Sequence, residues 1–208
     1  MPSRYGLTRH VDLCAARICR IRFVGRVSNP TTDFDHLEKI QFIAVDVETT
    51  GLDPWRGHRV IEIAAGKIQD GCFSDTFQSL IDCGRSIPKK IQEIHGITDE
   101  MLIGQPGPEE VFGRFLDFIG NSTLVAHNAS FDRSFIRAEL GRLGLGFYNP
   151  FQCTLELSRK KLSRLPDHRL ETVFWYLFPG EIEGIMAHRA LCDAWMVGRI
   201  WVKMGGGK

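Results

Sequence analysis

The chain has 208 residues, of which 43% are hydrophobic and 25% are charged, and its formal net charge is +1. This length suits one domain with one buried core, and no apolar run is long enough to cross a membrane, so we expect a soluble protein without a membrane partner. A net charge this close to zero gives no indication of nucleic acid, which has to be inferred from local patches and from the site.

The six cysteines are scattered, form no Cys-x-x-Cys pair and accompany no secretory signal. This usage is typical of reduced thiols and predicts a cytoplasmic protein. We expect the cysteines to be small buried hydrophobic residues rather than metal ligands.

Residues 1–39 predict a basic N-terminal extension, because they lack a clean period and carry six arginines before residue 27. Three interpretations remain open: a short basic helix that contacts nucleic acid or a partner, an Arg-rich transit peptide, and a loosely ordered extension. Residues 40–204 are expected to form the main domain, and residues 205–208 a tail.

Three runs at the start of the main domain indicate β-strands. Gln41–Glu48 is almost continuously apolar apart from two acids, as in a strand buried on both faces. Arg59–Ile68 and Cys72–Ile81 flank the turn residues Asp70 and Gly71, which is a hairpin signal. We therefore expect three antiparallel strands first.

The rest of the domain is mostly helical by pattern, with apolar residues three and four apart. In chain order we expect a short helix and turn at Pro88–Leu102, an amphipathic helix at Pro108–Ile119, a strand at Thr123–Ala126, a helix after Asn128 that ends near Gly141, one or two helices within residues 151–178, and a final helix after His188. The basic run Arg159–Arg169 is either a track for phosphates or a solvated helix face.

Two acids, Asp46 and Glu48, interrupt the first strand. Because they are two residues apart, their side chains leave the same face of the strand and can converge on one metal ion. Burial of an unpaired carboxylate is costly, and a divalent cation with oxygen ligands is the usual way to keep it charged. Taken alone, such a pair is more often a strand-end salt bridge than a metal site.

Three further polar residues fall at the starts of helices. Asp132 lies in a first helical turn, where an acid can simply complement the helix dipole. His188 and Asp193 are five residues apart and cannot share one face of a regular helix. We therefore place His188 on the loop before the final helix, where a base can move, and Asp193 inside the helix, where a metal ligand is held rigidly.

Together these residues form three motifs in a fixed order: Asp46-Val-Glu48-Thr-Thr-Gly-Leu52, His127-Asn-Ala-Ser-Phe-Asp132 and His188-Arg-Ala-Leu-Cys-Asp193. The combination resembles the exonuclease motifs of the DnaQ-like (DEDDh) 3′→5′ exonuclease family, of the proofreading or epsilon-subunit type. The segment Ile94-His95-Gly-Ile-Thr98 is also similar to that family.

The resemblance implies an α/β fold of ribonuclease H-like type, in which a mixed five-stranded sheet is flanked by helices. It also implies that Asp46, Glu48, Asp132 and Asp193 hold two divalent cations, Mg²⁺ or Mn²⁺. By similarity, Asp46 bridges both ions, Glu48 and Asp193 serve the ion that binds the attacking water, and Asp132 helps to hold the other. His188 is implied as the general base, since a histidine can accept a proton near neutral pH.

The same resemblance places the terminal nucleotide against a set of residues near the first motif: Thr49, Thr50, Gly51, Leu52, His95 and Phe131. Glycine lets backbone approach the sugar closely, and an apolar side chain can wedge beside the last base. For Phe131 a plain core aromatic residue is the alternative interpretation, and for His95 a helix-capping residue.

The resulting prediction is an enzyme, a metal-dependent 3′→5′ exonuclease that releases nucleoside 5′-monophosphates from the 3′ end of single-stranded DNA or a frayed duplex end. Two alternatives are an exoribonuclease with the same chemistry, because the 2′-OH is sensed by local shape, and a non-catalytic adaptor that binds nucleic acid or a polymerase. A DNA polymerase or another replication or repair protein, if it is a partner, would contact the basic N-terminal segment.

Overall fold

The computed structural model describes residues 42–69, 72–180 and 188–206. The predicted extension at 1–39 and the hairpin turn at Asp70 and Gly71 lie outside the described residues, so the predicted domain boundaries stay predictions. Within the described part, no helix is both long and apolar enough to span a bilayer.

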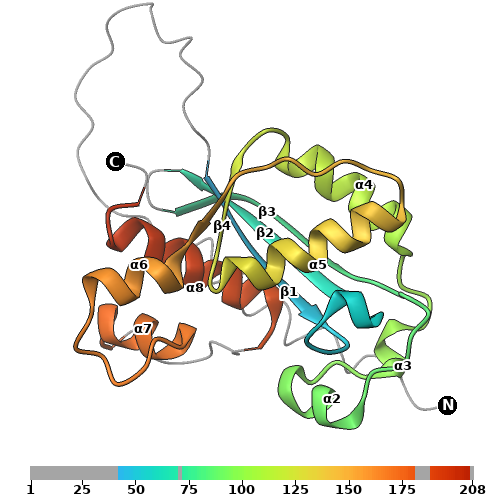
Figure 1. Cartoon of the computed structure of the whole chain (residues 1–208), viewed down its shortest axis with the longest axis horizontal. Coiled ribbons are helices and arrows are strands. Elements are labelled where there is room, and N and C mark those ends of the chain that lie inside the picture. The colour runs from blue at the N-terminus through green and yellow to red at the C-terminus, as the bar shows by residue number, and fades with distance from the viewer. Residues whose placement is uncertain (1–41, 70–71, 181–187, 207–208) are drawn as a thin grey trace, which may run out of the picture.

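A mixed five-stranded sheet in the order β3-β2-β1-β4-β5 forms the centre of the domain (Figure 1). The strands are β1 (Phe42–Thr49), β2 (Val60–Gln69), β3 (Cys72–Leu80), β4 (Thr123–Ala126) and β5 (Phe151–Cys153). β1 pairs antiparallel with β2, which pairs antiparallel with β3, while β4 lies parallel to β1 and to β5. Both the antiparallel opening and the five-stranded sheet are confirmed.

Helices make up most of the remaining described chain. They are a 3-10 turn η1 (Pro54–Arg56), α2 (Lys89–His95), α3 (Asp99–Leu102), α4 (Pro108–Ile119), α5 (Ala129–Arg142), α6 (Thr154–Lys161), α7 (Leu170–Leu177) and α8 (Ala190–Lys203). The predicted helices at 108–119 and after residues 128 and 188 are confirmed. The segment 151–178 instead begins with the short strand β5 before its two helices.

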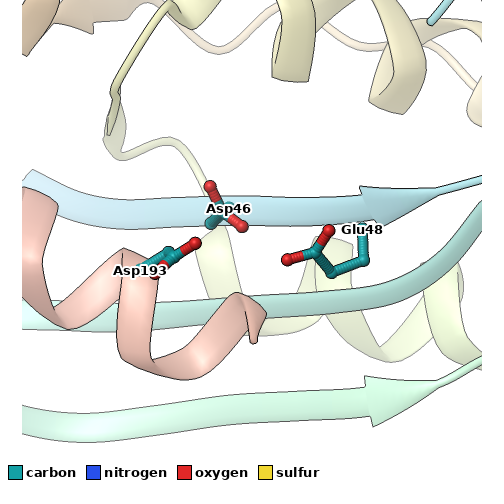
Figure 2. A group of neighbouring side chains, drawn as sticks. All are labelled: Asp46, Glu48 and Asp193. Atoms are coloured by element: carbon teal, nitrogen blue, oxygen red, sulfur yellow. The ribbon is translucent and has the colours of Figure 1, made fainter. Parts of the chain in front are cut away.

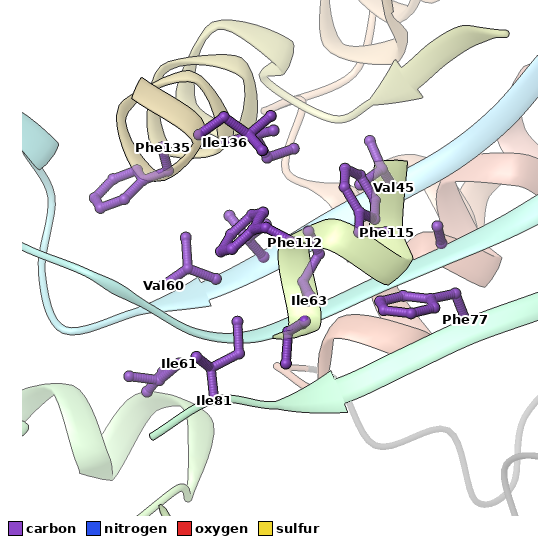
Figure 3. Close-up of a cluster of buried hydrophobic side chains, with 14 of the residues drawn as sticks. Val45, Val60, Ile61, Ile63, Phe77, Ile81, Phe112, Phe115, Phe135 and Ile136 are labelled. Carbon is purple, nitrogen blue, oxygen red and sulfur yellow. The ribbon is translucent and has the colours of Figure 1, made fainter. Parts of the chain in front are cut away.

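The larger core lies between one face of the sheet and helices α4 and α5 (Figure 3). Phe112 and Phe115 of α4 meet Phe135 and Ile136 of α5 there, and all four side chains are fully buried. The helical spacing of these residues gives each helix an apolar face toward the sheet. These buried side chains hold α5 against the sheet. They thereby also fix the position of the acid in its first turn.

Helix α8 packs against the opposite face of the sheet, where Val197 and Trp201 contact Ala44 and Val125. The approach is close, because a Cβ atom added to Gly198 would lie only 2.6 Å from the ring of Phe73. Glycine at this position therefore lets the helix lie near the strands. An acid in the first turn of α8 can consequently reach side chains of β1.

The cysteines only partly follow the expectation of reduced thiols. Cys83 and Cys153 are free thiols, as expected. Cys192, in contrast, is disulfide-bonded, which corrects the expectation for this residue.

Candidate active site

Three carboxylates meet between β1 and α8 (Figure 2). Strand alternation directs Val45 and Val47 into the larger core, so Asp46 and Glu48 project from the other face of β1, toward α8. Asp193 lies in the first turn of α8. One oxygen from each acid lies within 4.8 Å of the others, close enough to ligate a single cation. The predicted convergence of this pair with Asp193 is observed.

A fourth acid, Asp132, approaches the same place from the first turn of α5. It is 2% exposed, and the backbone amides of Asp132 itself and of Val47 donate hydrogen bonds to it. Among the neighbouring charges, Asp132 acts most strongly on the pKa of Asp46, ahead of Asp193 and Glu48. Asp46 is therefore the acid whose pKa is affected by each of the other three.

All four carboxyl groups have raised pKa values, chiefly because burial penalises the charged form. The pKa of Asp46 lies well above its usual range, with the neighbouring acids as the second cause. Burial and the adjacent carboxylates raise the pKa of Glu48 to about 8 and that of Asp193 to about 7. Burial also raises the pKa of Asp132 to about 8, although the two backbone hydrogen bonds oppose the shift.

This donor set fits a hard divalent cation. Carboxylate oxygens are the ligands that Mg²⁺ and Mn²⁺ prefer, and a cation would relieve the repulsion that raises the pKa values. The Oδ1 atom of Asp193 is buried and has no hydrogen-bond partner among the described residues. A buried oxygen without a hydrogen-bond partner destabilises the fold, and a bound cation would supply the missing partner.

The raised pKa values predict that the metal-free protein becomes less stable as pH rises. In the unfolded chain the acids titrate at about pH 4, whereas in the folded protein the pKa of Asp193 is about 7 and the pKa values of Glu48 and Asp132 are about 8, so the folded state binds more protons in this window. The free energy of unfolding should fall from about pH 5 to about pH 8 without divalent cations, and Mg²⁺ should counteract the fall because it binds the ionised acids of the folded state.

Differential scanning calorimetry in EDTA and in Mg²⁺ measures this effect. Glu48→Gln removes one titrating group and should flatten the dependence of Tm on pH in EDTA, whereas the exposed Asp117→Asn on α4 serves as the control. A Tm in EDTA that rises with pH would contradict the assigned pKa shifts.

His188 lies on the loop directly before α8, as predicted. Its backbone N–H donates to Oδ2 of Asp193 at 3.2 Å, which fixes the loop to the site. Its φ angle is +63°, a left-handed conformation that is uncommon for residues other than glycine. The ring is about half exposed, with Nε2 3.6 Å from Oε1 of Glu171 in α7. A base at this position is close to the acids but is not packed among them.

The N-terminus of α8 is held by Glu62, a residue that the sequence analysis did not single out. Glu62 is fully buried in β2, opposite Glu48 of β1. Arg189 donates to it from Nε at 3.1 Å and from Nη2 at 2.8 Å, and Gln78 and the amide of Ala190 donate to the same carboxylate. This pairing lies between His188 and α8, so it positions both His188 and Asp193.

Loss of Arg189 should strongly destabilise the fold, because Glu62 would remain as a buried charge without its cation. We expect Arg189→Met to lower the free energy of unfolding by about 3 to 5 kcal/mol in urea denaturation. Arg114→Met, which breaks an exposed ion pair with Glu110, is the matched control and should cost about 1 kcal/mol or less. A double variant Glu62→Leu, Arg189→Met should recover much of the lost free energy of unfolding, because no buried charge remains. If Arg189→Met alone were as stable as wild type, Arg189 would not be needed to pair with Glu62.

Four of the six residues expected around the terminal nucleotide, those at 49–52, form a compact loop at the end of β1. The hydroxyl of Thr49 donates to the carbonyl of Gly51 at 2.6 Å, and Oγ1 of Thr50 accepts from the amide of Arg59 at 3.0 Å. A Cβ atom on Gly51 would lie 2.4 Å from the His58 ring, so this position needs glycine. Both threonine hydroxyls therefore shape the loop, while Leu52 projects from it and is 80% exposed.

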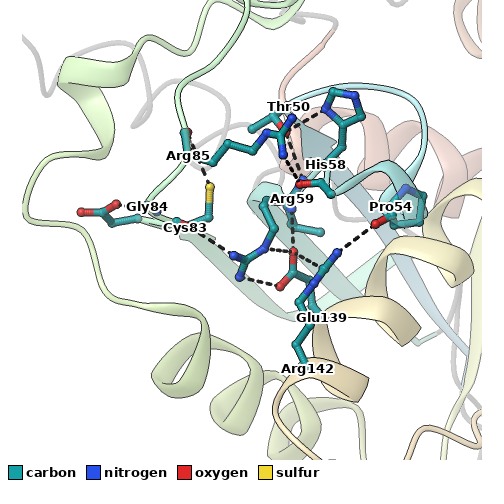
Figure 4. A network of polar contacts seen from close by, with 12 residues as sticks. Thr50, Pro54, His58, Arg59, Cys83, Gly84, Arg85, Glu139 and Arg142 are labelled. Carbon is teal, nitrogen blue, oxygen red and sulfur yellow. Dashed lines mark hydrogen bonds and ion pairs between the residues drawn. The ribbon is translucent and has the colours of Figure 1, made fainter.

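An ion network ties this loop to α5 (Figure 4). Glu139 is 1% exposed and accepts from Nε and Nη2 of Arg59 at 2.8 and 2.9 Å. Arg142 pairs with the same carboxylate at 3.1 Å and donates to the carbonyl of Pro54 at 2.9 Å. Neither Glu139 nor Arg59 was identified from the sequence. The network makes the loop a fixed part of the domain.

His95 and Phe131 have the structural roles that were considered as alternatives. Nδ1 of His95 accepts from the amide of Ile97 at 3.0 Å, where α2 ends, while its Nε2 is buried without a hydrogen-bond partner among the described residues. Burial is the main reason that the pKa of His95 is lowered. Phe131 packs on Phe135 with ring centroids 4.9 Å apart, but it is only partly buried. A role of either residue in nucleotide binding stays a prediction.

With this geometry established, comparison with known proteins identifies the class of the molecule. Residues 43–200 match the exonuclease family of RNase T type. The DNA polymerase III epsilon subunit of Aquifex aeolicus is 36% identical over 171 residues, which are 82% of this chain and 83% of that subunit. The PolC-type DNA polymerase III of Halalkalibacterium halodurans is 41% identical over 79% of this chain, which spans only 11% of that polymerase.

Solved structures of exonucleases have a fold similar to that of this chain. Exonuclease X, in complex with 5′-overhanging duplex DNA, is 26% identical with a TM-score of 0.62, covering 78% of this chain and 90% of that one. The nuclease domain of 3′hExo, a DEDDh family member bound to rAMP, has a TM-score of 0.67 at 16% identity, with 81% and 92% of the two chains covered. The second likeness concerns the fold alone.

The chain therefore belongs to the exonuclease family. Within that family it is a 3′→5′ exonuclease of DnaQ or epsilon type, and the predicted ribonuclease H-like fold is confirmed. Exonucleases of this family use divalent metal ions, and the acids between β1, α5 and α8 are suitable ligands.

Proposed function

We propose that the protein hydrolyses the last phosphodiester bond at the 3′ end of a DNA strand and releases a nucleoside 5′-monophosphate. The observation that carries the proposal is the convergence of Asp46, Glu48 and Asp193, with Asp132 acting on the same point. Four acids in one place, two of them buried and two partly buried, would be costly for a protein that only binds nucleic acid, because burial penalises each charge. This cost argues against the adaptor alternative.

Two cations, Mg²⁺ or Mn²⁺, would be held by these acids. Asp46 would be shared between the ions, since the charges of Asp132 and Asp193 both act on it. Glu48 and Asp193 would complete one site, and Asp132 would complete the other. When bound, such ions make a water more acidic and stabilise the leaving 3′ oxygen.

His188 is proposed as the general base that takes the proton from the attacking water. Its backbone is tied to Asp193, and its half-exposed ring is free to turn between Glu171 and the acids. Proton transfer by a placed side chain contributes about 10² to 10⁴ in rate. Thr49, Thr50, Gly51 and Leu52 would receive the terminal nucleotide beside the acids, completed by His95 and Phe131.

DNA is the preferred substrate in this proposal, because the relatives over most of this chain are named as parts of DNA polymerases and Exonuclease X was solved with DNA. We further propose that the exonuclease domain spans residues 40–204, that the protein works in the cytoplasm, and that a DNA polymerase or another replication or repair protein contacts residues 1–39. Pull-down with and without residues 1–39 tests the last point.

The deciding experiment follows 5′-labelled DNA and RNA of the same sequence in Mg²⁺, Mn²⁺ or EDTA. A ladder of shortened DNA products that requires metal, with slower cleavage of RNA, is the expected result. Faster cleavage of RNA would favour the exoribonuclease alternative. Tight binding of either strand without any ladder would favour the adaptor.

A further inference from the structure

An open cleft of about 660 Å³ lies next to the loop at residues 49–52, which we call the nucleotide loop. It does not include the four acids, which we call the acidic site. Its walls come from η1, from the last turns of α5 and from the segment after α5. Two exposed aromatic residues contribute to it, Trp55 and Tyr148, which are 75% and 93% exposed. A single exposed aromatic side chain is common on a protein surface and needs no explanation. Two such side chains in one cleft are uncommon and indicate a binding surface.

The charge of the cleft is positive. Arg137 and Arg142 line it, and the described residues that line it include no acid. Glu139, beneath the cleft, faces both Arg59 and Arg142, so one carboxylate is shared by two guanidinium groups. Arg137 is exposed and forms no ion pair within the described part of the chain. A polyanion can therefore be bound here with little competition from the protein's own acids.

Hydrogen bonds hold the backbone that carries Trp55 in place. Asp53 accepts a hydrogen bond from the amide of Trp55 at 2.9 Å, and Arg142 donates to the carbonyl of the preceding Pro54. The Tyr148 ring lies over Gly146, where a Cβ atom would be 2.6 Å from the ring. A surface whose backbone is already held in place loses less entropy on binding.

We propose that this cleft binds the substrate strand beyond its terminal nucleotides, by stacking bases on Trp55 and Tyr148 and by pairing phosphates with Arg137 and Arg142. Aromatic residues interleaved with basic ones are the usual surface for single-stranded nucleic acid. An apolar peptide would leave the guanidinium group of Arg137, which is exposed, without a partner. The inference rests on the proposed function, because it takes the strand end to lie at the acids.

The spacing supports this occupant. On α5, Arg137 and Arg142 lie about 8 to 15 Å along the helix axis from Asp132, at 1.5 Å per residue. With about 3.4 Å per stacked nucleotide, that is roughly two to four nucleotides from the acids. Leu52 and Trp55 are three residues apart on the loop that joins the two places. A dinucleotide should therefore occupy the acidic site without reaching the cleft.

Phosphorothioate DNA strands of about two to ten nucleotides, which resist hydrolysis, measure binding, and ordinary strands of the same lengths measure kcat/KM. For wild type we expect affinity to increase until the strand reaches the cleft. Trp55→Ala and Tyr148→Ala should each weaken binding of the longer strands by about fivefold to a hundredfold. Arg137→Glu should weaken it too and reduce its dependence on salt. Only long strands should quench the part of the tryptophan fluorescence that Trp55→Ala removes.

Arg114→Glu on α4 is the charge-matched control for Arg137→Glu and should bind the longer strands as wild type does. Dinucleotide hydrolysis should stay within about twofold in all cleft variants, because the acids and the loop bind it alone. Unchanged affinity for long strands would overturn the proposal. Equal losses on dinucleotides and long strands would also overturn it, since the residues would then act through the acidic site. A wild-type protein without nuclease activity would instead refute the proposed function.

Discussion

Asp46→Asn is expected to abolish hydrolysis and, at the same time, to stabilise the metal-free protein. The charges of the other acids all raise the pKa of Asp46, so its loss should remove the ligand that the cations share. With several kcal/mol of charge stabilisation lost, kcat should fall by about 10³-fold or more. The amide cannot ionise, so at alkaline pH, where the carboxyl group of Asp46 would become charged, the repulsion among the acids decreases and Tm in EDTA should rise.

Single-turnover hydrolysis and calorimetry on the same preparation measure both effects. Asp117→Asn on α4 makes the same chemical change at an exposed position and should alter neither quantity. Isothermal titration with Mg²⁺ should show weaker binding only in the Asp46 variant. If Asp46→Asn kept wild-type activity, the acids would not form the catalytic centre.

His188→Asn is expected to lower kcat by about 10² to 10⁴-fold while Mg²⁺ binding is retained, which is the usual loss when a general base is removed. Asparagine tolerates the left-handed backbone that His188 adopts at φ +63°, so the variant tests the ring without straining the loop. Single-turnover hydrolysis at saturating Mg²⁺, which keeps the acids ionised, measures this loss.

The companion variant His188→Gly preserves the same backbone conformation and leaves space for a small base. Added imidazole should restore part of its activity, whereas it should not affect Asp46→Asn. A variant that keeps full activity at every pH would show that another group, or water itself, accepts the proton. Loss of Mg²⁺ binding in His188→Asn would point instead to a role of this loop in holding Asp193.

Much of the fold was predictable because its signals are local. The alternation in β1 already places Asp46 and Glu48 on one face, and the spacing between His188 and Asp193 separates loop from helix. Strand β5 was missed because three residues carry no recognisable period.

The residues missed near the site depend on pairing across the chain. Glu62 meets Arg189, 127 residues later, and Glu139 meets Arg59, 80 residues earlier. Spacing between neighbours cannot reveal such partners. One signal was available for Glu62, since it interrupts the apolar strand Val60–Gln69 in the same way that Asp46 interrupts β1. A buried acid in a strand requires a cation, either a side chain or a metal, and the sequence alone does not say which.

The position of α8 also determines at what point during synthesis the acidic site becomes complete. Asp46 and Glu48 emerge early from the ribosome, but Asp193 is synthesised last of the acids, on the helix that closes one face of the sheet. At bacterial or eukaryotic elongation rates the delay is on the order of ten seconds. A nascent chain therefore carries an incomplete set of ligands until α8 has docked, and the proposed hydrolysis requires the docked helix.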